Sequence, residues 1–270
     1  MGGSFAGKLF LILISISILI IFFSGKSLAS DISLKPLELE EELVKQKVKK
    51  IPTGAKMVFI KGGCYEMGDN FGDGESDEKP VHTTCVNDFY LGETEVTQAQ
   101  WESIMGRNPS RHKGTKMPVE SVRWNDVQEF LKRLNEKAGG KYRLPTEAEW
   151  EYGAREGGKK IKYGTGKNGI SQSDARYDSA DGTVPVKSYT PNAVGLYDMS
   201  GNVWELCADW YDENYYKNFT KDNPKGPSSG YTRVLRGGSW VSKPNGVRVS
   251  VRGGYISDTR YNNIGFRLAR

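Results

Sequence analysis

The stretch Gly195-Leu-Tyr-Asp-Met-Ser-Gly-Asn-Val-Trp-Glu205 is followed by two further blocks that contain glycine and aromatic residues. These are Arg233-Val-Leu-Arg-Gly-Gly-Ser-Trp240 and Gly265-Phe-Arg-Leu-Ala-Arg270. Paired glycines allow backbone segments to approach more closely than any residue with a Cβ permits, and tryptophans are typical anchors of a core. The three blocks therefore predict a loop-rich domain held together by aromatic side chains.

The composition fits one medium-sized domain. The chain has 270 residues, among them 32 glycines and 6 tryptophans, which is enough to bury a substantial core. The formal net charge is +5, but lysine and arginine are scattered among the acids. No basic run with interleaved aromatics occurs, so the composition argues against nucleic-acid binding.

Residues 1–29 are typical of a signal peptide. Lys8 precedes a run of 15 mostly apolar residues, 9–23, and Ser27-Leu-Ala29 offers small residues for cleavage before Ser30. The run is short for a bilayer span and suits the apolar part of a signal peptide. An uncleaved anchor is the alternative, and membrane contact is then expected through this segment alone. Either way the remainder is predicted to be exported, to the periplasm, the cell surface or the medium.

Residues 30–52 are predicted to form a helical connector. Glutamates come first and lysines follow, an order that suits the helix dipole, and Glu41 with Lys45 forms a favourable i,i+4 pair. The folded domain is expected to span residues 53–270.

Capping signals predict three helices in this domain. Thr97 with Gln100 and Thr146 with Glu149 are capping boxes, and Asn125 is a candidate N-cap. No further helical period of useful length follows residue 157. Short strands and glycine-rich loops fill the rest, so the predicted fold class is α+β with few helices. The predicted helices span residues 98–105, 126–138 and 147–155.

Three cysteines are present: Cys64, Cys85 and Cys207. The strand-like runs 57–67 and 81–90 could pair as a long hairpin with Cys64 facing Cys85, and an oxidising compartment would favour a disulfide between them. Their spacing fits no zinc pattern. Cys207 is interpreted as a small buried apolar residue.

An ordered series of motifs over residues 56–270 resembles the formylglycine-generating enzyme family, also called the sulfatase-modifying factor family. The resemblance implies a fold related to C-type lectins, with much irregular loop. Motifs of this kind support a fold more firmly than an activity. Besides the three blocks above, the motifs are Gly63-Cys-Tyr-Glu-Met-Gly68, Glu78-Lys-Pro-Val-His82, Glu95-Val-Thr97, Pro118-Val119, Val122-Arg-Trp124 and Arg143-Leu-Pro-Thr-Glu-Ala-Glu-Trp-Glu-Tyr152.

The resemblance also implies calcium. The family's ligands at one site fall on Asp198, Gly201, Val203 and Glu205, a set of carboxylates and carbonyls that suits a hard cation. The alternative is a salt-linked turn in which Glu205 pairs with an arginine. A second and weaker site falls on Asp178 and the carbonyl of Ala180. There an expected asparagine is replaced by Arg176, which is unfavourable beside calcium.

The family's enzymes bind Cu(I) through two cysteines, and the first of these positions falls on Ser242. No cysteine occurs among residues 208–270. Because Cu(I) requires soft thiolate ligands, the sequence argues against copper and against oxidation of cysteine to formylglycine. No catalytic residue is therefore assigned.

Three functions remain open. The first is a noncatalytic module that binds an exported protein, peptide or glycan, or serves as a subunit of a periplasmic or surface assembly. The second is an oxidoreductase that modifies an exported protein or peptide without copper thiolates. The third is a ligand-binding protein diversified by a retroelement. The expected binding face comprises Trp240, Ser242, Asn245, Arg248, Arg252, Tyr255 and Tyr261.

Tyrosine and arginine are efficient binding residues, but the two arginines of this face could equally support loops through internal hydrogen bonds. If Tyr255 belongs to the face, Tyr255→Ala should weaken binding and leave stability nearly unchanged.

Overall fold

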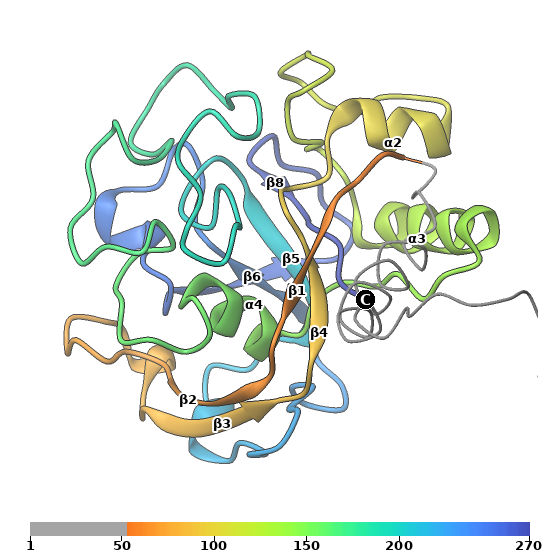
Figure 1. Ribbon diagram of the computed structural model, residues 1–270. Helices are drawn as coiled ribbons and strands as arrows, with labels where there is room; N and C mark the ends of the chain where they lie inside the picture. The colour runs from red at the N-terminus through yellow and green to blue at the C-terminus, as the bar shows by residue number, and fades with distance from the viewer. Residues whose placement is uncertain (1–52) are drawn as a thin grey trace, which may run out of the picture. The chain divides into compact units, whose positions relative to one another are not determined.

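A computed structural model describes residues 53–270, in which short strands and three α-helices are joined by long irregular loops (Figure 1). This arrangement confirms the α+β class. The predicted signal peptide (1–29) and connector (30–52) lie outside the described residues. Within residues 53–270, no helix is long and apolar enough to cross a bilayer.

The first four strands form one long hairpin that is interrupted in the middle. Met57 pairs with Gly92 and Gly63 pairs with Val86, so both halves of the hairpin keep a single antiparallel register. Cys64 lies directly opposite Cys85 in this register, and the two form the predicted disulfide. The strands are β1 (Met57–Ile60), β2 (Gly63–Met67), β3 (His82–Val86) and β4 (Phe89–Gly92).

The capping boxes of α2 (Gln98–Met105) and α4 (Glu147–Ala154) form as predicted, and Gly106 ends α2 in the left-handed region. The N-terminus of α3 (Trp124–Ala138) was predicted wrongly, because the helix begins two residues earlier than expected. The carboxylate of Asp126 accepts a hydrogen bond from the backbone N–H of Arg123. Asp126 therefore occupies the third position of the helix, and Arg123 rather than Asn125 is the N-cap.

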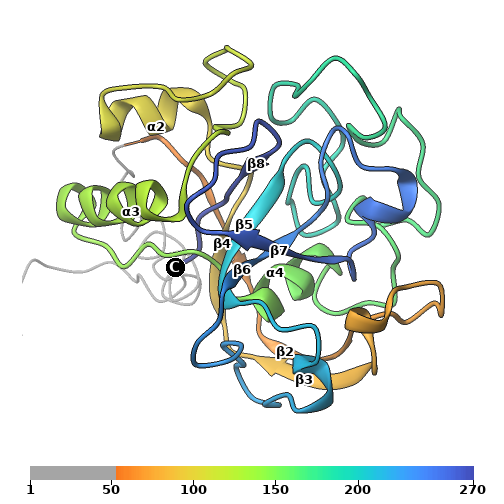
Figure 2. The same ribbon diagram turned by 180° about the vertical axis from the view of Figure 1, so that it is seen from behind.

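The C-terminal half contributes a four-stranded sheet, seen behind α4 in Figure 1 and from its other side in Figure 2. The strand order is β7-β6-β5-β8, with β8 parallel to β5 and the other neighbours antiparallel. Helix α4 packs between this sheet and the β2–β3 hairpin. The strands are β5 (Trp204–Trp210), β6 (Thr232–Arg236), β7 (Arg252–Ile256) and β8 (Ile264–Gly265).

Buried ion pairs join α4 to this sheet. Glu147 and Glu151 lie one turn apart on the same helix face. Glu147 receives two hydrogen bonds from the Arg252 guanidinium, at 2.6 and 2.9 Å. Glu151 pairs with Arg236 of β6 and, at 2.7 Å, with Arg155. Burial alone would raise the pKa of Glu147, but the adjacent arginines hold it below its usual value. Glu147 and Glu151 of the Arg143–Tyr152 motif therefore connect helix α4 to the sheet.

The last residues of the chain return to the middle of the domain. The N–H of Gly92 donates to the carbonyl of Leu268 at 2.7 Å, and Tyr90 and Arg270 exchange two backbone hydrogen bonds. Arg143 and Ala269 are paired in the same way. The block Gly265–Arg270 is thus an internal element that connects β4 to Arg143, four residues before α4 begins.

Candidate functional site

A tight turn before β5 carries the predicted calcium ligands. Asp198 and Gly201 both have positive φ, at +59° and +90°. A Cβ on Gly201 would lie 2.2 Å from the carbonyl oxygen of Arg176, so glycine is required there. The buried carboxylate of Glu95 holds the turn by accepting hydrogen bonds from the amide of Asn202 and the backbone N–H of Val203. Sequence reasoning assigned Glu95 no role, although it stands in the motif Glu95-Val-Thr97.

Glu205 forms the arginine pair that was the alternative to a metal. The Arg267 guanidinium donates to both of its carboxylate oxygens, at 2.6 and 2.7 Å, and the indole of Trp150 donates to one of them at 2.7 Å. Glu205, Arg267 and Trp150 are all fully buried. The first and third motif blocks and the Arg143–Tyr152 motif therefore meet at this carboxylate, which gives them a structural purpose independent of any metal.

The residues of the weaker calcium site already have cationic partners. Asp178 and Ala180 line one hollow of about 390 Å³, together with Arg176. The Asp178 carboxylate pairs with Lys243 at 2.6 Å. Arg176 donates to the carbonyl of Gly182 at 2.9 Å and pairs with Asp181. The structure brings these residues together with bound side-chain cations among them, so their donor chemistry does not fit calcium.

Ser242 lies in a closed turn. Its hydroxyl accepts a hydrogen bond from the N–H of Ser239 at 3.0 Å, and its own N–H donates to the carbonyl of Ser239 at 2.9 Å. Two residues before it, the indole of Trp240 is mostly buried against His112. Cys207 is fully buried within β5, and burial raises the pKa of its thiol well above the usual value. The one free thiol of residues 53–270 is therefore held in its protonated form, which is a poor metal ligand.

The predicted binding face divides into exposed and buried residues. Asn245 and Tyr261 are exposed, Ser242 is partly exposed, and Val241 is a further exposed apolar side chain next to Ser242 in the sequence. Trp240 is only 8% exposed, and its indole N–H donates to the carbonyl of Asn262. We call residues Trp240, Val241, Ser242, Asn245 and Tyr261 the C-terminal face.

The remaining three predicted binding residues point into the domain. Arg248 donates to both oxygens of Glu78, at 2.6 and 2.8 Å, and Arg252 is bound to Glu147. The Tyr255 ring is 2% exposed and its hydroxyl donates to the carbonyl of Val122. The geometry favours the loop-supporting interpretation of the arginines. Tyr255→Ala is now expected to reduce stability, in contrast to the expectation for an exposed binding residue.

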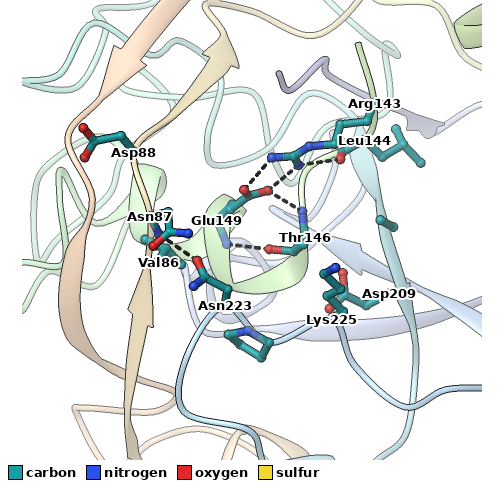
Figure 3. A pocket seen from close by; sticks show the side chains of 12 residues that line it. Val86, Asn87, Asp88, Arg143, Leu144, Thr146, Glu149, Asp209, Asn223 and Lys225 are labelled. Atoms are coloured by element: carbon teal, nitrogen blue, oxygen red, sulfur yellow. Dashed lines mark hydrogen bonds and ion pairs between the residues drawn. The ribbon is translucent and has the colours of Figure 1, made fainter. Parts of the chain in front are cut away.

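A second hollow lies on other elements of the domain (Figure 3). Its volume is about 640 Å³, and its walls come from residues 86–88, 143–149, 208–209 and 223–225. On one wall Arg143 and Glu149 form a two-bond ion pair at 2.6 and 2.7 Å. We call this space the Asp209 hollow, after the carboxyl group of β5 that lines it and is 3% exposed.

Asp209 is expected to make stability depend on pH. Burial, followed by the nearby Glu147 carboxylate, raises the pKa of Asp209 to about 8. The pKa of an aspartate in the unfolded chain is about 3.9. The folded protein therefore keeps a proton that the unfolded chain releases. The resulting stabilisation is complete below about pH 4 and is lost as the pH rises through about 8.

Asp209→Asn should remove this loss, because the amide cannot ionise. Relative to the wild type, the variant should gain up to about 1.4 kcal/mol of unfolding free energy per pH unit between about pH 4 and 8. Urea unfolding of both proteins across that range measures the effect. Glu213→Gln, at an exposed acid, is the control. Parallel pH profiles of the wild type and Asp209→Asn would contradict the prediction.

Comparison with known proteins decides the family. Residues 40–270 match the model of the sulfatase-modifying factor enzyme 1-like domain. The chain belongs to this family. A formylglycine-generating enzyme of Streptomyces coelicolor is 33% identical, over 78% of this chain and 88% of that protein. The serine/threonine-protein kinase Pkn1 of Chlamydia trachomatis is also 33% identical, over 85% of this chain, but the match spans only 40% of the kinase.

Solved structures of similar chains agree with this membership of the sulfatase-modifying factor family. Treponema denticola variable protein 1 superposes with a TM-score of 0.72 and 32% identity, covering 80% of this chain and 94% of that one. PvdO from Pseudomonas aeruginosa gives a TM-score of 0.70 and 29% identity, covering 79% and 93%. The three motif blocks thus identify both the family and the fold.

Members of the sulfatase-modifying factor family bind calcium, and the turn at Asp198 carries part of a donor set that suits this ion. Burial, with a smaller contribution from the Glu205 carboxylate, raises the pKa of Asp198 to about 6. Burial and these two acids also raise the pKa of Glu95. A divalent cation would relieve this surplus of buried negative charge. However, Glu205 is held by Arg267, and no group of three or more acidic, histidine or cysteine side chains within residues 53–270 is arranged to hold a metal. The remaining donors that fit calcium are Asp198 and backbone carbonyls.

Calcium binding at this turn therefore remains a prediction. If calcium binds there, a concentration of about 100 times the dissociation constant should stabilise the fold by about 2.7 kcal/mol. For a domain of this size, that corresponds to a rise in Tm of roughly 5–10 °C. Thermal unfolding in calcium and in chelator measures the shift. Asp198→Ala should abolish it, whereas Asp258→Ala, at an exposed acid, should not. Equal Tm values of the wild type in calcium and chelator would contradict the prediction.

Proposed function

We propose that this chain is an exported binding or accessory module of the sulfatase-modifying factor family, which recognises a protein, peptide or glycan through the C-terminal face. The observation that carries the proposal is that residues 208–270 contain no cysteine, while Ser242, on which the family resemblance places the first copper-binding cysteine, closes a turn with its hydroxyl. The family frame is retained around it, while the thiols that the oxidase chemistry needs are absent from the sequence after Cys207.

The chemistry of the donor set supports the noncatalytic interpretation. Cu(I) requires thiolates or other soft ligands, and the Ser242 hydroxyl is a hard donor that is already engaged with Ser239. Cys207 cannot substitute, because it is buried among the core side chains that surround Trp150. The residues around Ser242 therefore do not fit copper, and we derive no reaction through that metal.

The C-terminal face has the properties of a prearranged binding surface. Val241, Asn245 and Tyr261 are exposed on loops that the Ser239–Ser242 turn and the buried Trp240 hold in place. An exposed tyrosine such as Tyr261 provides contact area at a small entropic cost. In addition, the backbone N–H of Asp178 donates a hydrogen bond to the carbonyl of Ser242.

The proposal is tested by affinity capture from the exported fraction with mass spectrometry, comparing the wild type with a Tyr261→Ala, Asn245→Ala double variant. A specific partner should be retained by the wild type and lost from the double variant. Tyr231→Ala is the matched control, because Tyr231 is 89% exposed and lies outside the face. Equal capture by all three proteins would contradict the assignment of the face. A mass change in the partner that depends on this protein would instead favour the oxidoreductase alternative.

Diversification by a retroelement is a second candidate. It is favoured by the similarity to Treponema denticola variable protein 1, which extends over 94% of that chain at 32% identity. On this proposal the partner differs between strains and the face changes with it. Sequencing the gene from many strains tests the idea: substitutions should concentrate in residues 241–263, and an even spread along the domain would contradict it.

A further inference from the structure

The Asp209 carboxyl group has no cationic partner within 4 Å among the residues that the structure describes. Its Oδ2 accepts one hydrogen bond, at 2.9 Å, from the backbone N–H of Glu147. Its Oδ1 lies close to Gly226, because a Cβ added to that glycine would be 3.3 Å from this oxygen. The side chain is almost wholly buried, yet it lines a hollow of about 640 Å³. A buried carboxyl group that borders open space is well placed to receive a ligand.

The charged groups around Asp209 are engaged with one another. Arg143 is bound by Glu149, and Arg252 is bound by Glu147. Arg233 of β6 is stacked between Trp124 and Trp210 and donates to the carbonyl of Ala208. Glu147 and Glu149 both act to disfavour a charge on Asp209, whereas Arg252 favours it. The neighbouring cations therefore leave Asp209 without a counter-ion of its own.

The other walls of the hollow suit a short hydrocarbon chain. Val86, Leu144, Ala208 and Pro224 supply apolar surface, and Lys225 and Asp88 lie exposed at the surface of the protein. Arg143 is already bound by Glu149, so the wall around Asp209 offers an anionic ligand little attraction. A ligand with a positive end and an apolar stem complements both features.

We propose that the Asp209 hollow binds a primary alkylammonium group, such as a lysine side chain of a partner or a small amine, with the Asp209 carboxylate as its counter-ion. No residue of this site belongs to the C-terminal face, so the two proposals stand or fall separately. Binding converts the Asp209 carboxylic acid to a carboxylate that pairs with the R–NH₃⁺ group. The proton that Asp209 loses passes to the solvent, and no covalent bond to the ligand forms.

The test uses three four-carbon probes of different charge: butylamine, butanol and butyrate. Calorimetry at neutral pH should detect binding of butylamine, with at least tenfold weaker binding of the other two. Repeating the titration in buffers of different ionisation enthalpy should show release of up to about one proton per butylamine bound. Equal binding of butanol or butyrate would overturn the proposal, as would the absence of butylamine binding.

Variants connect the binding to the hollow. Asp209→Asn should weaken butylamine binding at least tenfold and abolish proton release, whereas Glu213→Gln should change neither. Ala208→Leu keeps the carboxyl group and fills the space, so it should also weaken binding. Lys225→Gln removes a like charge near the site and should tighten binding. A short peptide with one lysine, compared with butylamine, distinguishes a partner's side chain from a free amine. Unchanged binding in both Asp209→Asn and Ala208→Leu would place the amine elsewhere and overturn the assignment.

Discussion

Replacing Glu151 with leucine is expected to reduce the unfolding free energy by about 3–5 kcal/mol, because it removes one partner from a buried ion cluster. The guanidinium groups of Arg155 and Arg236 are 1% and 0% exposed, and both donate to this carboxylate. The backbone N–H of Gly68 would lose its acceptor as well. For a domain of this size, the loss corresponds to a fall in Tm of roughly 6–20 °C.

Glu129→Leu is the matched control for Glu151→Leu. Glu129 also pairs with an arginine of its own helix, Arg133, at 2.7 Å, but both side chains are more than 40% exposed. An exposed i,i+4 pair contributes at most about 0.5 kcal/mol. Urea unfolding should therefore show a loss of unfolding free energy that is severalfold larger in Glu151→Leu than in Glu129→Leu. If Glu151→Leu loses less than about 1 kcal/mol, the cluster does not hold α4 to the sheet in the way described.

Gly238→Ala is expected to destabilise the domain by about 2–5 kcal/mol for two separate reasons. The backbone of Gly238 has φ +69°, which strains a residue with a Cβ. In addition, the new Cβ would lie 2.3 Å from the carbonyl oxygen of Gly246 and 2.7 Å from a methyl group of Val247. Because the backbone oxygen cannot move aside easily, the turn that carries Ser242 would have to shift.

Gly195→Ala separates the two reasons. Gly195 has φ +87°, but an added Cβ would meet no atom within 4 Å. This variant should therefore lose only the roughly 1–2 kcal/mol of backbone strain. Chemical denaturation of both variants measures the difference, which is the contribution of the close approach. Equal losses in the two variants would show that the contact between Gly238 and Gly246 relaxes without consequence.

The features that sequence analysis predicted correctly depend on neighbours in the sequence or on a single covalent bond. The capping boxes at Thr97 and Thr146 involve residues three apart, and they form as expected. Cys64 also lies opposite Cys85 in the first hairpin, and the disulfide between them forms as expected. The start of α3 was misplaced because Asn125 resembles an N-cap only by residue type. The acceptor at this helix start is instead the Asp126 carboxylate, which binds the backbone N–H of Arg123.

The candidate site was harder to predict because its partners are far apart in the sequence. Arg252 binds Glu147, 105 residues earlier, and nothing near Arg252 indicates that its side chain points inward. The residue pattern of the C-terminal face therefore could not distinguish a binding arginine from a core arginine. Asp209 did have a signal, because it follows Cys207 by two residues on a strand. Residues two apart on a strand share a face, so a buried Cys207 implies a buried Asp209.

The pairing of residues 266–270 with β4 and Arg143 also determines when the domain can fold. β4 and Arg143 leave the ribosome more than 120 residues before the segment that completes their hydrogen bonds, since Tyr90 pairs with Arg270 and Arg143 pairs with Ala269. Contacts this distant form slowly, because a long loop must close before they contribute. The nascent chain therefore remains incompletely folded until synthesis reaches residue 270.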